Sequence, residues 1–313
     1  MTTFNDYLTA GLRAFEQWRP RLEQRLTRRS YTFPGNAKAQ DRQEGETPGQ
    51  SDPKMDSLMD IQAIKVSLPI SLGQLLDQSG KLPLHSLVLG VCDDGLPFLL
   101  DLTNPAPGAL LICGDAGVGK TGLVLSILDS AARLNTAAQL ELSVIATDID
   151  PFMYLAKFEH CQEIFTSEED VTGELIGELA DIAEQRRRQR PEEPAILLVI
   201  DDLAACLEQL DQDAFNRLYW LIRHGPRSRV WTIATLPMER AREIEPRFLS
   251  AFRTRLFGRT ADRRLVASLS DDDDLQPRGL DKGQFYIPYG GEWMRLWACV
   301  REEQETESVG GVP

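Results

Sequence analysis

The chain has 313 residues, 42% hydrophobic and 26% charged, which suits one large α/β domain with appendages and a full core. No apolar run reaches the roughly 18 residues needed to cross a bilayer, and no signal-peptide pattern opens the sequence, so we expect a cytoplasmic protein without membrane insertion. The net charge of −14 argues against a protein that binds nucleic acid over its whole surface, but it is compatible with a local basic strip. The five cysteines are placed singly, which argues against a zinc site or a disulfide framework.

The first 33 residues carry an apolar stripe with helical spacing. Its members lie three or four residues apart: Phe4, Leu8, Leu12, Phe15, Trp18, Leu22 and Leu26. This spacing predicts an amphipathic helix over 1–33, which either packs on its own domain or docks a protein partner or a second copy. Residues 34–56 are rich in Pro, Gly, Gln and charge, which predicts a flexible linker. A folded domain over 57–302 and a disordered acidic tail over 303–313 complete the predicted organisation.

Between the linker and the tail, short apolar segments alternate with helical patterns. The predicted strands are 109–113, 141–146, 195–200, 230–235 and 253–258, and the predicted helices are about 120–134, 167–190, 211–224 and 260–270. The first three strands are apolar with little alternation, as expected where helices cover both faces of a sheet. This order predicts a mostly parallel sheet with right-handed crossovers. Ligands of such sheets bind at the carboxyl ends of the strands.

Residues 114–121 match the pattern G-x-x-x-x-G-K-[ST], which is typical of a phosphate-binding P-loop. The predicted nucleotide-binding residues are Gly114, Asp115, Ala116, Gly117, Val118, Gly119, Lys120, Thr121 and the following Gly122. The glycines let backbone N–H groups turn toward phosphate oxygens, Lys120 reaches the β- and γ-phosphates, and the Thr121 hydroxyl ligates Mg²⁺. A predicted helix follows the loop, and its dipole also favours an anion. We therefore expect ATP and Mg²⁺ as the ligands of this site.

Two further strand ends supply polar side chains. Segment 195–200 is followed by Asp201, predicted to hold the magnesium shell, and by Asp202, predicted to act as base or water-positioning residue. An Asp pair of this kind also caps helices, which is the alternative. Segment 230–235 ends in Thr235, whose hydroxyl either senses the γ-phosphate or is an ordinary strand-end threonine. These strand ends are expected to meet the P-loop at one edge of the sheet.

The order of these motifs resembles the FtsK/SpoIIIE motor domains of the HerA–FtsK group of P-loop ATPases, over roughly residues 85–302. The matching segments are 89–97, 114–121, 150–151, 181–186, 199–206, 225–237, 253–259 and 280–290. The resemblance implies an additional-strand, RecA-like P-loop NTPase core, with helices on both faces of a mostly parallel sheet. It also implies a homo-oligomer, a hexameric ring, that hydrolyses ATP to move double-stranded DNA.

Three positions depart from the family pattern. Asp202 stands where the family has Glu, Leu236 where it has Gln, and Pro226 where it has Arg. Arg227 and Arg229 follow closely, and Arg227 is the candidate for an arginine finger that acts across a subunit interface, with a solvated arginine as the alternative. Together these departures favour ATP binding with slow hydrolysis over rapid hydrolysis.

Two functional hypotheses stay open. One is an ATP-driven ring motor, a DNA translocase. The other is a nucleotide-gated regulatory or secretion-type ATPase that engages a protein partner, with slow or no hydrolysis; the N-terminal helix would hold that partner. A small-molecule kinase is disfavoured because the sequence shows no lid-like arginine cluster. The arginines within 186–190 either contact nucleic acid or are solvated residues at the end of a helix. The acidic run 271–274 is interpreted as an exposed loop rather than a metal site.

Overall fold

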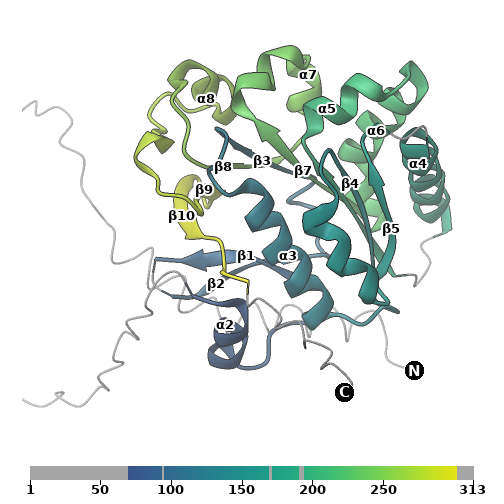
Figure 1. Cartoon of the computed structure of the whole chain (residues 1–313), viewed down its shortest axis with the longest axis horizontal. Helices are drawn as coiled ribbons and strands as arrows, with labels where there is room; N and C mark the ends of the chain where they lie inside the picture. The colour runs from purple at the N-terminus through teal and green to yellow at the C-terminus, as the bar shows by residue number, and fades with distance from the viewer. Residues whose placement is uncertain (1–69, 94, 169–170, 190–193, 302–313) are drawn as a thin grey trace, which may run out of the picture. The chain divides into compact units, whose positions relative to one another are not determined.

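The described part of the chain contains one ten-stranded mixed sheet with helices packed against it (Figure 1). The computed structural model describes residues 70–93, 95–168, 171–189 and 194–301. The predicted N-terminal helix (1–33), linker (34–56) and tail (303–313) lie outside these described residues, and the domain predicted over 57–302 is described from residue 70 onward. No helix of the described residues is long and apolar enough to span a membrane.

The strands lie in the order β2-β1-β10-β9-β8-β3-β7-β6-β4-β5. Neighbours are parallel from β8 to β5 and antiparallel from β8 to β2. The bounds are β1 Ser86–Cys92, β2 Pro97–Asp101, β3 Leu110–Gly114, β4 Leu140–Ala146, β5 Cys161–Thr166, β6 Ala195–Asp201, β7 Val230–Pro237, β8 Thr254–Phe257, β9 Gln284–Tyr289 and β10 Glu292–Trp297. The mostly parallel sheet predicted from the sequence is thus present.

Short connections place helices between the strands. The α-helices are α2 Leu72–Ser79, α3 Lys120–Leu134, α4 Val171–Gln189, α5 Leu203–Gln209, α6 Gln212–His224, α7 Pro246–Leu249 and α8 Arg263–Ser270. The 3₁₀ segments are η1 Asp150–Lys157, η2 Gly225–Ser228, η3 Met238–Glu243 and η4 Pro277–Gly279. Both η2 and η3 flank β7, so this strand enters and leaves the sheet through tight turns.

Alternate residues of the parallel strands build two hydrophobic cores, one on each face of the sheet. On β3, Leu111 and Cys113 belong to one core, whereas Leu110 and Ile112 belong to the other. This division follows from the two-residue period of a strand. Residues of α4, α5 and α6 complete the first core, and residues of α3 and η1 complete the second (Figure 1). Helices therefore cover both faces, as the sequence predicts.

The parallel register aligns the strand ends that carry the predicted site. Gly114 at the end of β3 pairs with Pro237 at the end of β7, and Ala146 of β4 pairs with Asp201 of β6. The P-loop, the Asp201 end of β6 and the end of β7 therefore lie at the same edge of the sheet. This is the edge at which parallel sheets bind their ligands.

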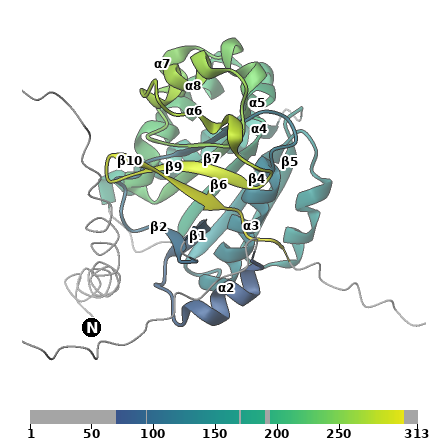
Figure 2. The same ribbon diagram turned by 90° about the vertical axis from the view of Figure 1, so that its left-hand side faces the viewer.

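The antiparallel part of the sheet was not predicted from the sequence. The five predicted strands are confirmed within one or two residues, but β1, β2, β9 and β10 were seen only as motif segments or were not recognised. Figure 2 shows the β9–β10 hairpin facing the viewer. The strand β9 pairs with β8, so the hairpin joins the parallel strands to β1 and β2.

Candidate nucleotide-binding site

The loop between β3 and α3 has the backbone shape of a phosphate cradle. Gly117 and Gly119 have φ angles of 74° and 98°, which side chains with a Cβ rarely adopt. In the described part of the chain, the N–H groups of Gly117, Val118 and Gly119 make no hydrogen bond. Because α3 begins at Lys120, its positive N-terminal end adds to these donors. The loop can therefore accept the phosphates of a nucleotide.

Lys120 lies over its own loop. Its Nζ donates to the carbonyl oxygens of Gly114 at 2.9 Å and Asp115 at 3.0 Å. Burial lowers the pKa of this ammonium, and the carboxylates of Glu239 and then Asp201 oppose that shift. The ammonium is thus held next to the phosphate cradle by two carbonyls, contacts that a bound phosphate can replace.

Two later segments of the chain brace the P-loop. The Asp115 carboxylate accepts hydrogen bonds from Thr260 Oγ1 at 2.8 Å and from the Ala261 N–H at 3.0 Å. The Gly283 N–H, just before β9, donates to the Val118 carbonyl at 2.9 Å. These contacts fix the loop from the connection after β8 and from the turn before β9.

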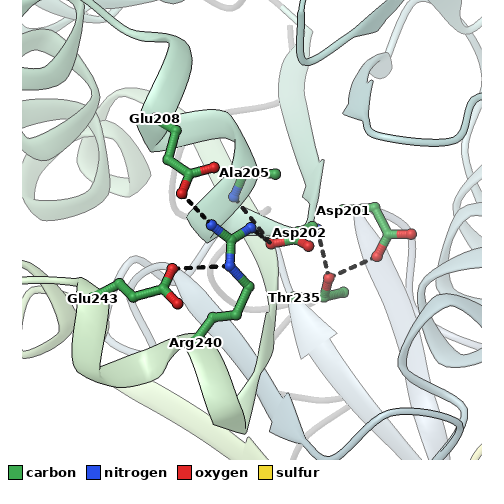
Figure 3. Close-up of polar contacts among 7 residues, drawn as sticks. All are labelled: Asp201, Asp202, Ala205, Glu208, Thr235, Arg240 and Glu243. Atoms are coloured by element: carbon green, nitrogen blue, oxygen red, sulfur yellow. Dashed lines mark hydrogen bonds and ion pairs between the residues drawn. The ribbon is translucent and has the colours of Figure 1, made fainter.

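The P-loop threonine and the two strand ends form one hydrogen-bonded chain. Thr121 Oγ1 donates to Asp201 Oδ2 at 2.9 Å, and Thr235 Oγ1 donates to Asp201 Oδ1 at 2.6 Å. The backbone N–H of Asp202 then donates to Thr235 Oγ1 at 2.8 Å (Figure 3). The structure therefore brings Thr121, Asp201, Asp202 and Thr235 together beside Lys120, which is the grouping expected from the sequence.

A hydroxyl and a carboxylate oxygen in contact are suitable ligands for Mg²⁺. Thr121 and Asp201 supply the hard oxygen atoms that this ion prefers, and Mg²⁺ usually completes its shell with water and phosphate oxygens. No group of three or more acidic, His or Cys side chains in the described residues forms a metal site without a nucleotide. The Thr121 hydroxyl and the Asp201 carboxylate thus fit an ion held jointly with phosphate.

The Asp202 side chain is engaged in local structure. Its backbone has a φ of 73°, uncommon for a residue with a Cβ. Its Oδ1 caps α5 by accepting the Ala205 N–H at 3.1 Å and lies 3.6 Å from Arg240 Nη1 (Figure 3). Arg240 is also paired with Glu208 and Glu243. The helix-capping alternative recognised in the sequence is therefore realised in this structure.

Arg227 lies at the other end of the sheet. It belongs to η2, which precedes β7, whereas the P-loop is level with Pro237 at the end of β7. The eight residues of β7 separate the two ends by roughly 25 Å. Within one chain, Arg227 is therefore not grouped with the P-loop, and any contact with a nucleotide would have to be with that of another copy.

Basic side chains gather around Arg227. We define the basic surface as Arg187, Arg223, His224, Arg227 and Arg253, which come from the ends of α4 and α6, from η2 and from the residue before β8. Burial lowers the pKa of His224, and the four arginines lower it further. Among the described residues, none of the five forms an ion pair with a carboxylate. This acidic protein thus has a local, uncompensated basic surface.

Two residues of the nucleotide-binding edge were missed in the sequence. Arg240 and Glu239 lie in η3, directly after the strand that carries Thr235. Arg240 contacts Asp202, and the charge of Glu239 opposes the lowering of the Lys120 pKa by burial. No motif marks them, because the family pattern around this strand ends at Pro237. The sequence could have indicated Glu239 and Arg240 only by their position, two and three residues after a strand that ends at the nucleotide-binding edge.

Solved structures share this fold. One is Thermomonospora curvata EccC (ATPases 2 and 3) in complex with a signal sequence peptide, with a TM-score of 0.60 and 18% identity, covering 74% of this chain and 43% of that chain. EssC (ATPases 2 and 3) from Geobacillus thermodenitrificans has a TM-score of 0.58 and 18% identity, covering 71% and 46%. The pCW3 conjugation coupling protein TcpA, as a monomer with ATPγS, has a TM-score of 0.54 and 19% identity, covering 72% and 68%.

These likenesses define the fold class. At identities of 18% to 19%, they show that the fold is shared with the EccC, EssC and TcpA structures, and a shared fold does not by itself give a function. This chain spans less than half the length of the EccC and EssC chains cited above. No protein-family model matches the sequence, and a search of curated proteins gives no match either.

Proposed function

We propose that this chain is an ATPase of the FtsK/HerA type that binds ATP with Mg²⁺ and hydrolyses it. The observation that carries the proposal is the hydrogen-bonded chain from Thr121 through Asp201 to Thr235, placed beside a P-loop with free N–H groups. Lys120 neutralises charge on the β- and γ-phosphates, and Thr121 with Asp201 holds the magnesium ion. The TcpA structure, which contains ATPγS, supports nucleotide binding by this fold.

Hydrolysis needs a group that positions water and a group that senses the γ-phosphate. Thr235 is the proposed sensor, because its hydroxyl links Asp201 to the Asp202 backbone and lies at the end of the strand beside the P-loop. Asp202 is the water-positioning residue predicted from the sequence, but its carboxylate must first leave the Ala205 N–H and Arg240. Its role therefore depends on a rearrangement at the start of α5.

We propose further that the chain assembles as a homo-oligomeric ring, of which a hexamer is the form expected from the resemblance. Arg227, roughly 25 Å from the P-loop of its own chain, then acts as an arginine finger toward the nucleotide of a neighbouring copy. An interface of this head-to-tail kind closes into a ring if the rotation between copies allows it. The proposed location is the cytoplasm.

Double-stranded DNA is the partner that the charge distribution favours. In a chain of net charge −14, the basic surface has four arginines without carboxylate partners, and phosphate groups are the ligands that such arginines bind. This arrangement is the local basic strip that a motor acting on DNA requires.

A protein partner is the second candidate, and one comparison favours it. The EccC structure that shares this fold contains a signal sequence peptide. By analogy, this chain would be a regulatory or secretion-type ATPase whose nucleotide state controls a protein partner, held through the N-terminal segment. Slow hydrolysis, consistent with the engaged Asp202 carboxylate, fits this candidate.

The test is steady-state ATP hydrolysis by the full chain, with and without double-stranded DNA, beside Lys120→Ala. A rate that rises several-fold with DNA and falls at least about 100-fold in the variant supports the DNA motor. Lys120-dependent ATP binding without DNA stimulation supports the protein-partner candidate instead. A wild-type chain that binds ATP no better than Lys120→Ala overturns the proposed function.

A further inference from the structure

Lys282 lies in the turn before β9, beside the phosphate cradle. Gly119 has no side chain, and a Cβ at its position would lie 3.3 Å from the Gly283 nitrogen and 3.8 Å from Lys282 Cγ. The stem of Lys282 therefore passes next to the glycine that precedes Lys120. Its ammonium stands beyond Cγ on a flexible stem, so it can reach a ligand that occupies the cradle.

Hydrogen bonds fix the turn that carries Lys282, which leads into the β9–β10 hairpin (Figure 2). The Gly283 N–H donates to the Val118 carbonyl of the P-loop at 2.9 Å. On the other side of the lysine, Gln284 Oε1 accepts the Asp281 N–H at 3.0 Å, and Gln284 Nε2 donates to Asp281 Oδ2 at 3.2 Å. The backbone on both sides of Lys282 is thus held, and one of its neighbours is held by the P-loop itself.

The Lys282 charge has no carboxylate partner in the described part of the chain. The side chain is exposed, and no described Asp or Glu forms an ion pair with it. The carboxylate of the preceding residue, Asp281, is engaged within the turn. The edge also carries the carboxylates of Asp115 and Asp201, whereas Lys120 is the only lysine of the P-loop. Because these carboxylates repel phosphates, an additional cation stabilises a polyphosphate bound at this edge.

The position of Lys282 favours the phosphates nearest to the nucleoside. The backbone N–H groups of a P-loop hold the α- and β-phosphates, whereas the P-loop lysine reaches the β- and γ-phosphates. Lys282 passes beside Gly119, whose N–H belongs to the cradle, and Lys120 lies over the carbonyls of Gly114 and Asp115. The two lysines therefore approach the phosphate chain from different segments of the protein.

We propose that Lys282 is a second phosphate-binding cation, which contacts the α- and β-phosphates of the bound nucleotide. The inference rests on the proposed nucleotide-binding function. The α- and β-phosphates are present in both ATP and ADP, so Lys282 strengthens the binding of both nucleotides. The turn before β9 thereby becomes part of the nucleotide site, in addition to its hydrogen bond to Val118.

The test compares Lys282→Gln with Lys81→Gln, a matched variant that removes the same charge from another exposed lysine. Lys81 lies shortly before Ser86, whose carbonyl accepts a hydrogen bond from Asn135 at the C-terminal end of α3, opposite to the P-loop. Dissociation constants of ATP, ADP and pyrophosphate are measured for the full chain by displacement of a fluorescent ATP analogue. Lys282→Gln is expected to weaken the binding of all three about tenfold, because a charge-assisted contact is lost. Lys81→Gln should match wild type.

Lys282→Arg keeps the positive charge and should recover most of the affinity. Affinities of Lys282→Gln within twofold of wild type overturn the inference. A loss for ATP and ADP with unchanged pyrophosphate affinity also overturns it, because the lysine would then contact the base or the ribose. A loss confined to ATP overturns it as well, because the contact would be to the γ-phosphate, and equal losses in Lys81→Gln would show an effect of net charge alone. Absence of Lys120-dependent ATP binding in the wild-type chain overturns instead the proposed function, a different result.

Discussion

Thr121 on α3 donates a hydrogen bond of 2.9 Å to Asp201 at the end of β6, and the two residues are 80 positions apart in the chain. The contact joins the first turn of the P-loop helix to a neighbouring part of the sheet. In the proposed function these two residues would hold the magnesium ion that accompanies ATP, so the pair is the first place to test the site.

Replacing Thr121 by Val should weaken magnesium-dependent ATP binding about tenfold or more, which corresponds to roughly 1.4 kcal/mol. The methyl group keeps the volume of the side chain but removes the oxygen ligand, and it leaves Asp201 Oδ2 without its donor. Titration with a fluorescent ATP analogue, with Mg²⁺ and with EDTA, measures the effect. Thr121→Ser, which keeps the hydroxyl, is the control; equal loss in both variants would contradict the assignment.

Replacing Arg240 by Ala should destabilise the fold by roughly 1–2 kcal/mol, because Asp202, Glu208 and Glu243 lose their shared cation while remaining close together. Urea unfolding monitored by circular dichroism gives the free energy. Arg240→Lys keeps the charge without the planar fork and should recover only part of the loss. An Arg240→Ala variant as stable as wild type would show that the cluster does not hold η3 in place.

Reversing two charges of the basic surface should weaken DNA binding if DNA is the partner. Arg223→Glu with Arg253→Glu is expected to reduce the slope of log affinity against log salt by about 2. The matched control is Arg242→Glu with Arg247→Glu, two exposed arginines outside this surface that carry the same change in net charge. Fluorescence anisotropy with labelled duplex DNA at several salt concentrations measures both. Equal losses in the two double variants would mean that net charge, and not this surface, governs binding.

Cys113 gives a prediction on pH. Burial raises the pKa of its thiol to about 12, against an ordinary value of 9.0. Between these values the unfolded chain loses the proton and the folded chain keeps it, so this group lowers stability as pH rises from 9 toward 12. Cys113→Ala leaves a cavity and is less stable at pH 8, but the difference from wild type should shrink at pH 10. Urea unfolding of both proteins at the two pH values measures this, and a constant difference would contradict the raised pKa.

The sequence predicted the parts of the fold whose signals are local. Strands such as β3 and β6 are continuous apolar runs, and each ends in residues with a recognisable chemical role, so both the elements and their common edge were predicted correctly. The antiparallel strand β10 lacks this signal, since it has mostly part-exposed residues and is held in the sheet by pairing with β9 and β1. Such pairing depends on distant segments, which one sequence does not reveal.

The site shows the same division. Lys120, Thr121, Asp201 and Thr235 were predicted because motif spacing and strand order specify them, and the structure brings them together. The contact between Asp202 and Arg240 was not predicted, because it depends on how η3 folds back after β7. Whether the carboxylate of an Asp-Asp pair caps a helix or faces a ligand is decided by such tertiary contacts, and the sequence left both alternatives open.

The conformation of the P-loop depends on hydrogen bonds from residues far along the chain. Asp115 is held by Thr260 and Ala261, and Val118 by Gly283, so the geometry of the loop is set by segments more than 140 positions downstream of Asp115. A fragment that ends before these residues would contain every motif of the nucleotide site and yet lack the supports that shape it. Truncation of the C-terminal strands should therefore also abolish nucleotide binding. Point substitutions are the better way to study the role of these strands apart from that of the nucleotide-binding site.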